Sequence, residues 1–229
     1  MKVTYLEHSG FAAEYKEYVL IFDWYRGSLP EFDQQKKIYV FASHSHYDHF
    51  NKKIFGWSEQ YPDVRYILSA DIAGKEQSER TVYVTANKKD DFDGIKVQTL
   101  HSTDEGVAFI VYMEDKVIYH AGDLNWWHWE EETESYNEQM RQDYQREIDK
   151  LKDIVIDIAF VPLDPRQENQ YAWGMDYFMK HTHTKYVFPM HMWGDYEVYD
   201  RLMENPEAEP YKERVIEVKE PGQVFEVNV

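Results

Sequence analysis

Residues 42–50 of the chain are Ala-Ser-His-Ser-His-Tyr-Asp-His-Phe, and they hold three of its ten histidines. The preceding residues 37–42 are mostly β-branched and aromatic, which predicts a buried strand that ends where the histidines begin. A rigid strand end can direct several side chains at one point. Imidazole and carboxylate groups bind divalent metals, so a metal site is predicted at His44, His46, Asp48 and His49. Their spacing suits two adjacent metal ions rather than one.

This His-x-His-x-Asp-His pattern resembles the metal-binding motif of the metallo-β-lactamase-fold hydrolases, and the similarity extends along most of the chain. Within that superfamily the sequence is most similar to the uncharacterised hydrolases grouped near the ascorbate-phosphate lactonases. The resemblance implies that one metal ion is held by the first two motif histidines and a later one. It implies that the second ion is held by the motif's aspartate, its last histidine and a final one, and that a further aspartate bridges both ions.

Three later residues occupy the remaining positions that the resemblance implies. His101 follows the predicted strand 94–100, and His191 directly follows residues 186–190, which also predict a strand. Asp123 ends residues 117–123, a strand followed by the Gly-Asp pair of the family. The expected ligands are therefore His44, His46 and His101 at one metal and Asp48, His49 and His191 at the other, with Asp123 as the bridge.

The resemblance implies an α+β fold, a four-layer αβ/βα sandwich in which two mixed β-sheets pack face to face with helices outside. Residues 1–229 are expected to form a single domain, with a helical insertion at about 125–152. In that insertion Met140, Tyr144 and Ile148 recur at helical spacing, which predicts one apolar face. We also expect a short helix at 70–79, a charged turn at 87–91, and a strand at 223–227 that closes the second sheet.

Four residues outside the motif are candidates for supporting roles. His8 lies in a predicted turn and either lines the site or is an ordinary surface histidine. Asp23 ends the third predicted strand and could orient a metal ligand from behind. Trp126 begins a tryptophan cluster just after Asp123 and either walls the pocket or anchors the helix. Arg166 follows the buried run 154–161, and it either binds an anionic group of the substrate or pairs with Asp164 to hold the turn.

Composition narrows the classes of partner. The formal net charge is −18, which opposes nucleic-acid binding, because that binding depends on basic residues. The chain has no cysteine, so any metal must use nitrogen and oxygen donors. No N-terminal signal pattern and no apolar stretch of membrane-spanning length is present, so we expect a cytoplasmic protein without a membrane partner. The expected partner is a small-molecule substrate, and the oligomeric state is left open.

The resemblance implies a metal-dependent hydrolase that uses a hydroxide bridging two metal ions to cleave an ester, lactone or phosphodiester bond of a small molecule. In this interpretation Asp48 is a ligand that can also pass on a proton, and Asp123 sets the metal spacing. The expected cofactors are two divalent metal ions, zinc first, with manganese or iron as alternatives. The alternative is a non-catalytic metal-binding or assembly protein that retains the fold.

Overall fold

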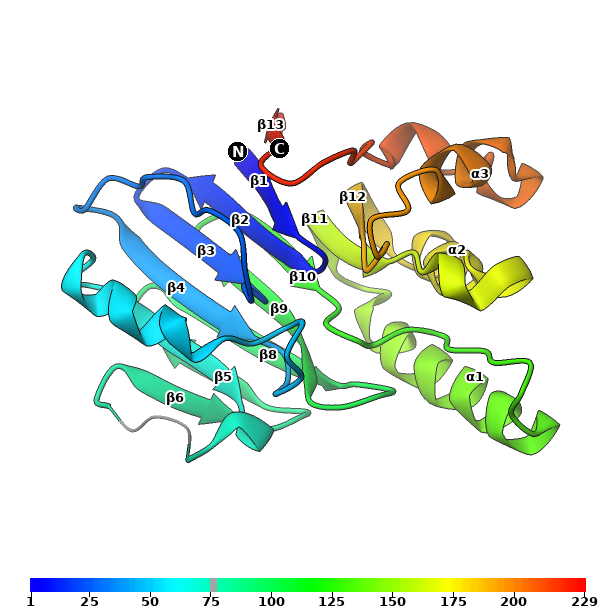
Figure 1. Cartoon of the computed structure of the whole chain (residues 1–229), viewed down its shortest axis with the longest axis horizontal. Helices are drawn as coiled ribbons and strands as arrows, with labels where there is room; N and C mark the ends of the chain where they lie inside the picture. Colours follow the sequence, from blue (N-terminus) through cyan, green and yellow to red (C-terminus); the bar gives the residue numbers. More distant parts are fainter. Residues whose placement is uncertain (75–77) are drawn as a thin grey trace.

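Two β-sheets form the centre of the computed structural model, which describes residues 1–74 and 78–229 (Figure 1). The first sheet has the strand order β13-β1-β2-β3-β4-β5-β6. Its strands β3 to β6 are parallel to one another, and the pairs β13-β1, β1-β2 and β2-β3 are antiparallel. The strand bounds are β1 Lys2–Glu7, β2 Gly10–Tyr15, β3 Tyr18–Phe22, β4 Lys37–Ala42, β5 Arg65–Ser69, β6 Thr81–Val84 and β13 Val224–Glu226.

The second sheet has the order β12-β11-β10-β9-β8-β7 and is also mixed. Strands β10, β11 and β12 are parallel, whereas β7 to β10 form an antiparallel meander. The strand bounds are β7 Lys89–Phe92, β8 Ile95–His101, β9 Val107–Met113, β10 Lys116–His120, β11 Val155–Pro162 and β12 His183–Met190. Each sheet therefore combines an antiparallel part with a parallel part.

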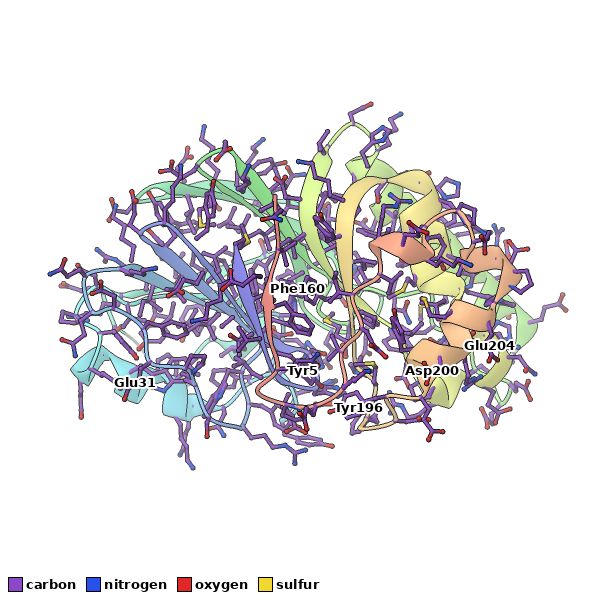
Figure 2. All side chains as sticks on the ribbon, turned by 90° about the horizontal axis from the view of Figure 1, so that it is seen from above. Tyr5, Glu31, Phe160, Tyr196, Asp200 and Glu204 are labelled. Carbon is purple, nitrogen blue, oxygen red and sulfur yellow. The ribbon has the colours of Figure 1, made fainter. Side chains whose placement is uncertain are left out.

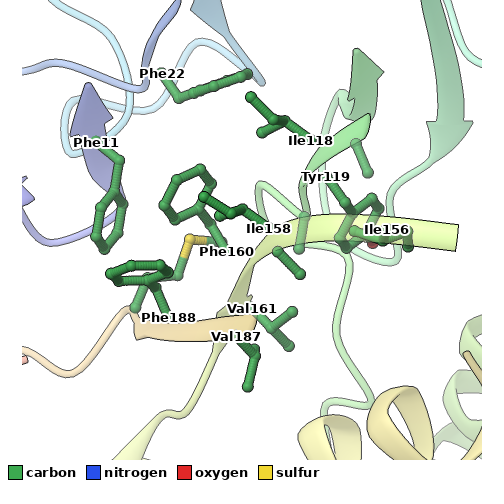
Figure 3. Packing of buried hydrophobic residues seen from close by; sticks show 14 of the residues in the cluster. Phe11, Phe22, Ile118, Tyr119, Ile156, Ile158, Phe160, Val161, Val187 and Phe188 are labelled. Carbon is green, nitrogen blue, oxygen red and sulfur yellow. The ribbon is translucent and has the colours of Figure 1, made fainter. Parts of the chain in front are cut away.

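Alternation along the strands explains why the two sheets stack. In β3, Leu20 faces the core between the sheets, whereas Ile21 belongs to a second apolar cluster on the outer face. In the core between the sheets, Phe11 of the first sheet lies against Phe160 of the second with 4.3 Å between ring centroids. Figure 3 shows these two rings together with Phe188, and Figure 2 shows Phe160 well inside the molecule. Burial of this aromatic layer holds the sheets together.

Helices cover the outer faces. The 3₁₀ helix η1 (Lys52–Glu59) packs through Ile54 into the outer cluster of the first sheet. On the other side α2 (Trp173–His181) stacks Phe178 on Tyr119 of β10, and α1 (Glu134–Ile148) packs beside α2. Figure 1 shows α1, α2 and α3 (Val198–Glu204) away from η1, with the strands between. The short 3₁₀ helices are η2 Ala70–Ile72, η3 Asp149–Leu151, η4 Pro165–Gln170, η5 Pro206–Ala208 and η6 Lys212–Arg214. The predicted four-layer sandwich is thus confirmed.

The structure corrects several local expectations. The last strand, β13, pairs with β1 in the first sheet and not in the second, because the two chain ends meet there and Met1 N donates to Val227 O at 2.7 Å. The expected turn at 87–91 is largely strand β7. The helix expected at 70–79 is only η2, and residues 75–77 lie outside the described residues. Within the insertion the helix is α1, preceded by a loop at 125–133. No helix among the described residues is long and apolar enough to cross a membrane.

Candidate metal centre

The predicted ligands gather where strands of both sheets end. His44 follows β4, Asp123 follows β10 and His191 follows β12. Parallel strands present their carboxyl ends at one edge of a sheet, and polar side chains from the loops beyond these ends can meet there. His8 reaches the same place from the turn between β1 and β2, and its carbonyl oxygen accepts a hydrogen bond from His191 N at 3.2 Å. This backbone hydrogen bond therefore holds the turn between β1 and β2 beside the end of β12.

One group of candidate ligands consists of His44, His46 and Asp123. Their ligand atoms all lie within 4.8 Å of one another. His44 Nε2 is 3.0 Å from His46 Nδ1 and 3.5 Å from Asp123 Oδ2. The other nitrogen of His46 is 3.5 Å from the Glu105 carboxylate, and the His46 side chain is 45% exposed. This group therefore lies on the open side of the centre.

A second group consists of His8, Asp48, His49 and His191, again within 4.8 Å of one another and all buried. His8 Nε2 is 3.5 Å from Asp48 Oδ2. Asp123 lies between the two groups: its Oδ1 is 3.2 Å from His49 Nε2 and 3.4 Å from His191 Nε2, and its Oδ2 faces His44. A single carboxylate thus contacts both groups.

Carboxylates behind the rings orient two of the histidines. Asp23 Oδ2 accepts a hydrogen bond from His49 Nδ1 at 2.7 Å, and Asp164 Oδ2 accepts one from His191 Nδ1 at 2.9 Å. Because a carboxylate only accepts, each Nδ1 carries a proton, and in the neutral His49 ring Nε2 keeps its lone pair on the side of Asp123. Asp23 also accepts from the backbone and hydroxyl of Ser43, so the same carboxylate holds the chain after β4.

Burial shifts the pKa values of several side chains at the centre. Burial lowers the pKa of His44 to about 3 and holds the pKa of His49 well below its usual range, so both rings are neutral near pH 7. Burial raises the pKa of Asp123 to about 7, with the nearby His191 acting in the opposite direction. Burial also acts to raise the pKa of Asp164, but hydrogen bonds from His191 and Arg166 outweigh it and lower that pKa to about 2.

Three polar atoms at the centre are buried without a hydrogen-bond partner in the described part of the chain. They are His8 Nε2, His49 Nε2 and Asp123 Oδ1. Leaving a buried polar atom unpaired costs about 1–3 kcal/mol, so such atoms need an explanation. A divalent cation between them would satisfy all three, and neutral imidazole with carboxylate is a donor set that such ions accept. The residues therefore fit the metal ions that the motif predicts.

His101, the third ligand expected at the first metal ion, lies in neither group of candidate ligands. It is the last residue of β8, its side chain is exposed, and its backbone N donates to Glu147 Oε2 of α1 at 3.1 Å. The hydrogen bond to α1 holds this strand end beside the helix, while the preceding Leu100 is buried in the core. His8, expected either to line the site or to lie on the surface, is buried within the second group.

Of the tryptophans in the loop after Asp123, Trp127 and not Trp126 contacts the centre. The Trp127 ring is 5.5 Å from the His191 ring, and its Nε1 donates to Asp123 O at 3.0 Å. Trp126 instead contacts Trp173 of α2 and lines a separate surface cavity of about 780 Å³ beside α1. The sequence could not distinguish them, because the loop after Asp123 has no regular periodicity from which to infer side-chain direction.

Arg166 is paired with Asp164, as the structural alternative expects. Its Nε lies 3.0 Å from both carboxylate oxygens, and its Nη2 donates to Oδ2 at 2.5 Å. The guanidinium also lies over the ring of Trp193, 4.4 Å from the centroid, and the Arg166 side chain is 47% exposed. Because Asp164 in turn holds His191, Arg166 acts on the centre through that carboxylate.

Sequence reasoning missed Trp193 and Glu105. Trp193 packs against His8 with 4.6 Å between ring centroids, and Glu105 faces His46. Nine described non-glycine residues have positive φ, and four of them lie at the centre: His8, Asp23, His191 and Trp193, with φ between 44° and 64°. Such conformations are strained and cluster at functional sites. No composition or spacing signal marks them, because strain of this kind appears only once the backbone path is known.

Comparisons with known proteins agree with this architecture, although no family model matches the sequence. A UPF0173 metal-dependent hydrolase from Desulforamulus reducens is 29% identical over 141 residues, which cover 54% of this chain and 62% of that relative. Igni18, a metallo hydrolase from the archaeon Ignicoccus hospitalis, aligns over 99% of both chains with a TM-score of 0.66 and 17% identity. The metallo-β-lactamase fold protein YhfI from Bacillus subtilis aligns over 98% of both chains with a TM-score of 0.64 and 14% identity.

The fold and the two His/Asp groups together define a metallo-β-lactamase-fold protein with a candidate metal centre. The resemblance to the metal-dependent hydrolases of this fold is thereby confirmed. Its placement near the ascorbate-phosphate lactonases stays a prediction.

Proposed function

We propose that the protein is a metal-dependent hydrolase that uses two divalent metal ions to cleave an ester, lactone or phosphodiester bond of a small molecule. The observation that carries this proposal is the convergence of two His/Asp groups on Asp123, with three buried polar atoms left for a cation to satisfy. The curated relative and the archaeal structural neighbour, both of which bear the name of metal-dependent or metallo hydrolases, support the same reaction class.

The residues at the centre have different roles in this proposal. His44 and His46 would hold one ion, Asp48, His49 and His191 the other, and Asp123 would contact both. Divalent ions in such a site lower the pKa of water toward about 7 and polarise the oxygen of the scissile group. Asp23 and Asp164 keep the His49 and His191 rings in the ligating orientation. The Asp48 side chain keeps 12% of its surface accessible to solvent, so it is placed to accept or return a proton.

Composition supports the choice of metal and substrate. With no cysteine in the chain, nitrogen and oxygen donors suit zinc, and they also suit manganese or iron. The net charge of −18 favours small molecules over nucleic acids, which basic proteins bind. A cytoplasmic location belongs to the same proposal.

The test combines metal analysis with a substrate panel. We expect the purified protein to contain divalent metal, and to hydrolyse at least one of a set of lactones, carboxylic esters and phosphodiesters. Chelation should abolish turnover and added Zn²⁺ or Mn²⁺ should restore it. An Asp123→Asn variant should lose activity, whereas Asp63→Asn, an exposed aspartate, should keep it. Metal binding without turnover on the whole panel would instead support a non-catalytic metal-binding protein.

A further inference from the structure

His8 has a position that the packing of the fold does not explain. It lies in the turn between β1 and β2 with φ of 54°, and its ring is enclosed by His49, His191 and Trp193. Its side chain is only 4% exposed. Its Nε2 has no hydrogen-bond partner among residues 1–74 and 78–229, and the nearest carboxylate oxygen, on Asp48, is 3.5 Å away.

Another buried histidine shows what a purely structural role looks like in this protein. His120 stacks on Phe22 at 4.9 Å, its Nε2 is 2.8 Å from Ser9 O, and its Nδ1 accepts from Gly122 N at 3.1 Å. Both of its nitrogens are therefore satisfied by the protein, as is usual for buried polar groups. His8 differs because its Nε2 has no partner and lies within 4.8 Å of the ligand atoms of Asp48, His49 and His191, of which His49 Nε2 also lacks a partner.

We propose that His8 is a metal ligand and that His101 is not. This inference rests on the proposed metal centre and specifies its coordination. His8, Asp48, His49 and His191 then enclose one ion with four protein ligands besides the shared Asp123, whereas the other ion has only His44, His46 and Asp123. Zinc sites with four protein ligands are typically structural, and those with three leave one position for water or substrate. The two metal positions are therefore unequal, and the substrate side is the one that contains the half-exposed His46.

The exposed position of His101 supports the same assignment. Its side chain faces solvent at the end of β8, where the backbone is hydrogen-bonded to α1. The first turn of the chain thus supplies a fourth ligand to one metal position, and the strand expected to supply a third ligand to the other position does not.

The absence of cysteine from the chain permits a direct test. A thiolate bound to Co²⁺ gives a charge-transfer absorption band in the near ultraviolet, and no native side chain of this protein can produce it. We would load the metal-free wild type, His8→Cys and His101→Cys with Co²⁺ alone and record absorption spectra. The band should appear in His8→Cys and be absent from His101→Cys and from the wild type.

Metal stoichiometry provides the second readout. Equilibrium dialysis against Co²⁺ should show two ions per chain in the wild type and in His101→Gln. In His8→Gln one of the two ions should bind at least about tenfold more weakly, because a ligand is lost. Circular dichroism of the metal-free variants verifies that each one folds, and His8→Cys tests the inference if His8→Gln does not.

The outcomes separate this inference from the proposed function. A band in His101→Cys alone, or in neither variant, would overturn the assignment of His8, and so would unchanged binding of both ions in His8→Gln. Failure of the wild type to bind Co²⁺ at all would contradict the proposed metal centre itself. Because none of these measurements uses a substrate, they stand whether or not the correct substrate has been found.

Discussion

Hydrogen bonds to the Nδ1 atoms of His49 and His191 orient these rings so that each Nε2 faces the centre. Asp23 receives three hydrogen bonds, from Ser43 N, Ser43 Oγ and His49 Nδ1. An amide in place of this carboxylate has only one accepting oxygen, so an Asp23→Asn variant should lose part of this arrangement. We expect metal affinity to fall by about 10–100-fold, the usual effect of losing such a supporting contact.

Competition with a metallochromic chelator measures this affinity. Asp63→Asn is the matched control, since Asp63 is exposed and far along the chain from the ligands. Equal affinity in the wild type and in Asp23→Asn would show that the orientation of His49 does not depend on this carboxylate.

Arg166 provides a second prediction at the scale of single residues. The guanidinium of Arg166 is hydrogen-bonded to Asp164, and Asp164 orients His191. Arg166→Lys should therefore impair the centre itself and not the recognition of one substrate. We expect kcat/KM to fall by about tenfold, equivalent to about 1.4 kcal/mol, on an anionic substrate and on its neutral analogue alike.

Arg201→Lys, at a cation–π contact with Tyr171, should leave both rates unchanged. A loss confined to the anionic substrate would revive the alternative in which Arg166 binds an anionic group directly.

At the scale of elements, the loop between β8 and β9 has to pass very close to the end of β4. Gly106 has φ of +72°, and a Cβ there would lie 1.9 Å from Ser43 O and 2.7 Å from His44 Cβ. Val107 N donates to the same Ser43 oxygen at 2.9 Å, so the contact fixes the start of the histidine motif. Only glycine permits this approach.

A Gly106→Ala substitution should therefore destabilise both the fold and the centre. Gly222→Ala is the matched control, because Gly222 has φ of +86° and nothing within 4 Å of a Cβ. Both variants bear the cost of a left-handed alanine, about 1–2 kcal/mol. Gly106→Ala should lose roughly 1–3 kcal/mol more from overpacking. Urea unfolding of the metal-free proteins measures the difference, and equal losses would mean that the loop can move away from Ser43.

At the scale of the whole molecule, the centre joins the two sheets. His44 and His49 follow a strand of the first sheet, whereas Asp123 and His191 follow strands of the second. Ions bound between them would stabilise the folded state, because the unfolded chain does not hold these residues together. One ion at about 100 times its Kd contributes about 2.7 kcal/mol.

Metal removal should accordingly lower the melting temperature, by roughly 5–10 °C for a protein of this size. Calorimetry with and without chelator measures the shift, and chelator presaturated with Zn²⁺ is the control. An unchanged melting temperature after verified metal removal would indicate that the ions do not link the sheets.

Much of this architecture could be predicted from local patterns. Continuous apolar runs identify the central strands of the first sheet, because both of their faces are buried. The histidine motif could also be located, because a dense cluster of ligand types after an apolar run is rare, and the resemblance to metallo-β-lactamase-fold hydrolases follows from it. These features involve residues close together in the sequence.

What only the tertiary structure decided involves residues far apart in the sequence. His8 meets Asp48 and His191, Trp127 instead of Trp126 reaches the centre, Asp164 holds both His191 and Arg166, and β13 returns to β1. His101 was expected as a ligand from its place after a strand, but it lies outside both groups, and its backbone N donates to Glu147 of α1. Sequence spacing determines which residues can reach the end of a strand, whereas the direction of each side chain depends on the elements packed against it.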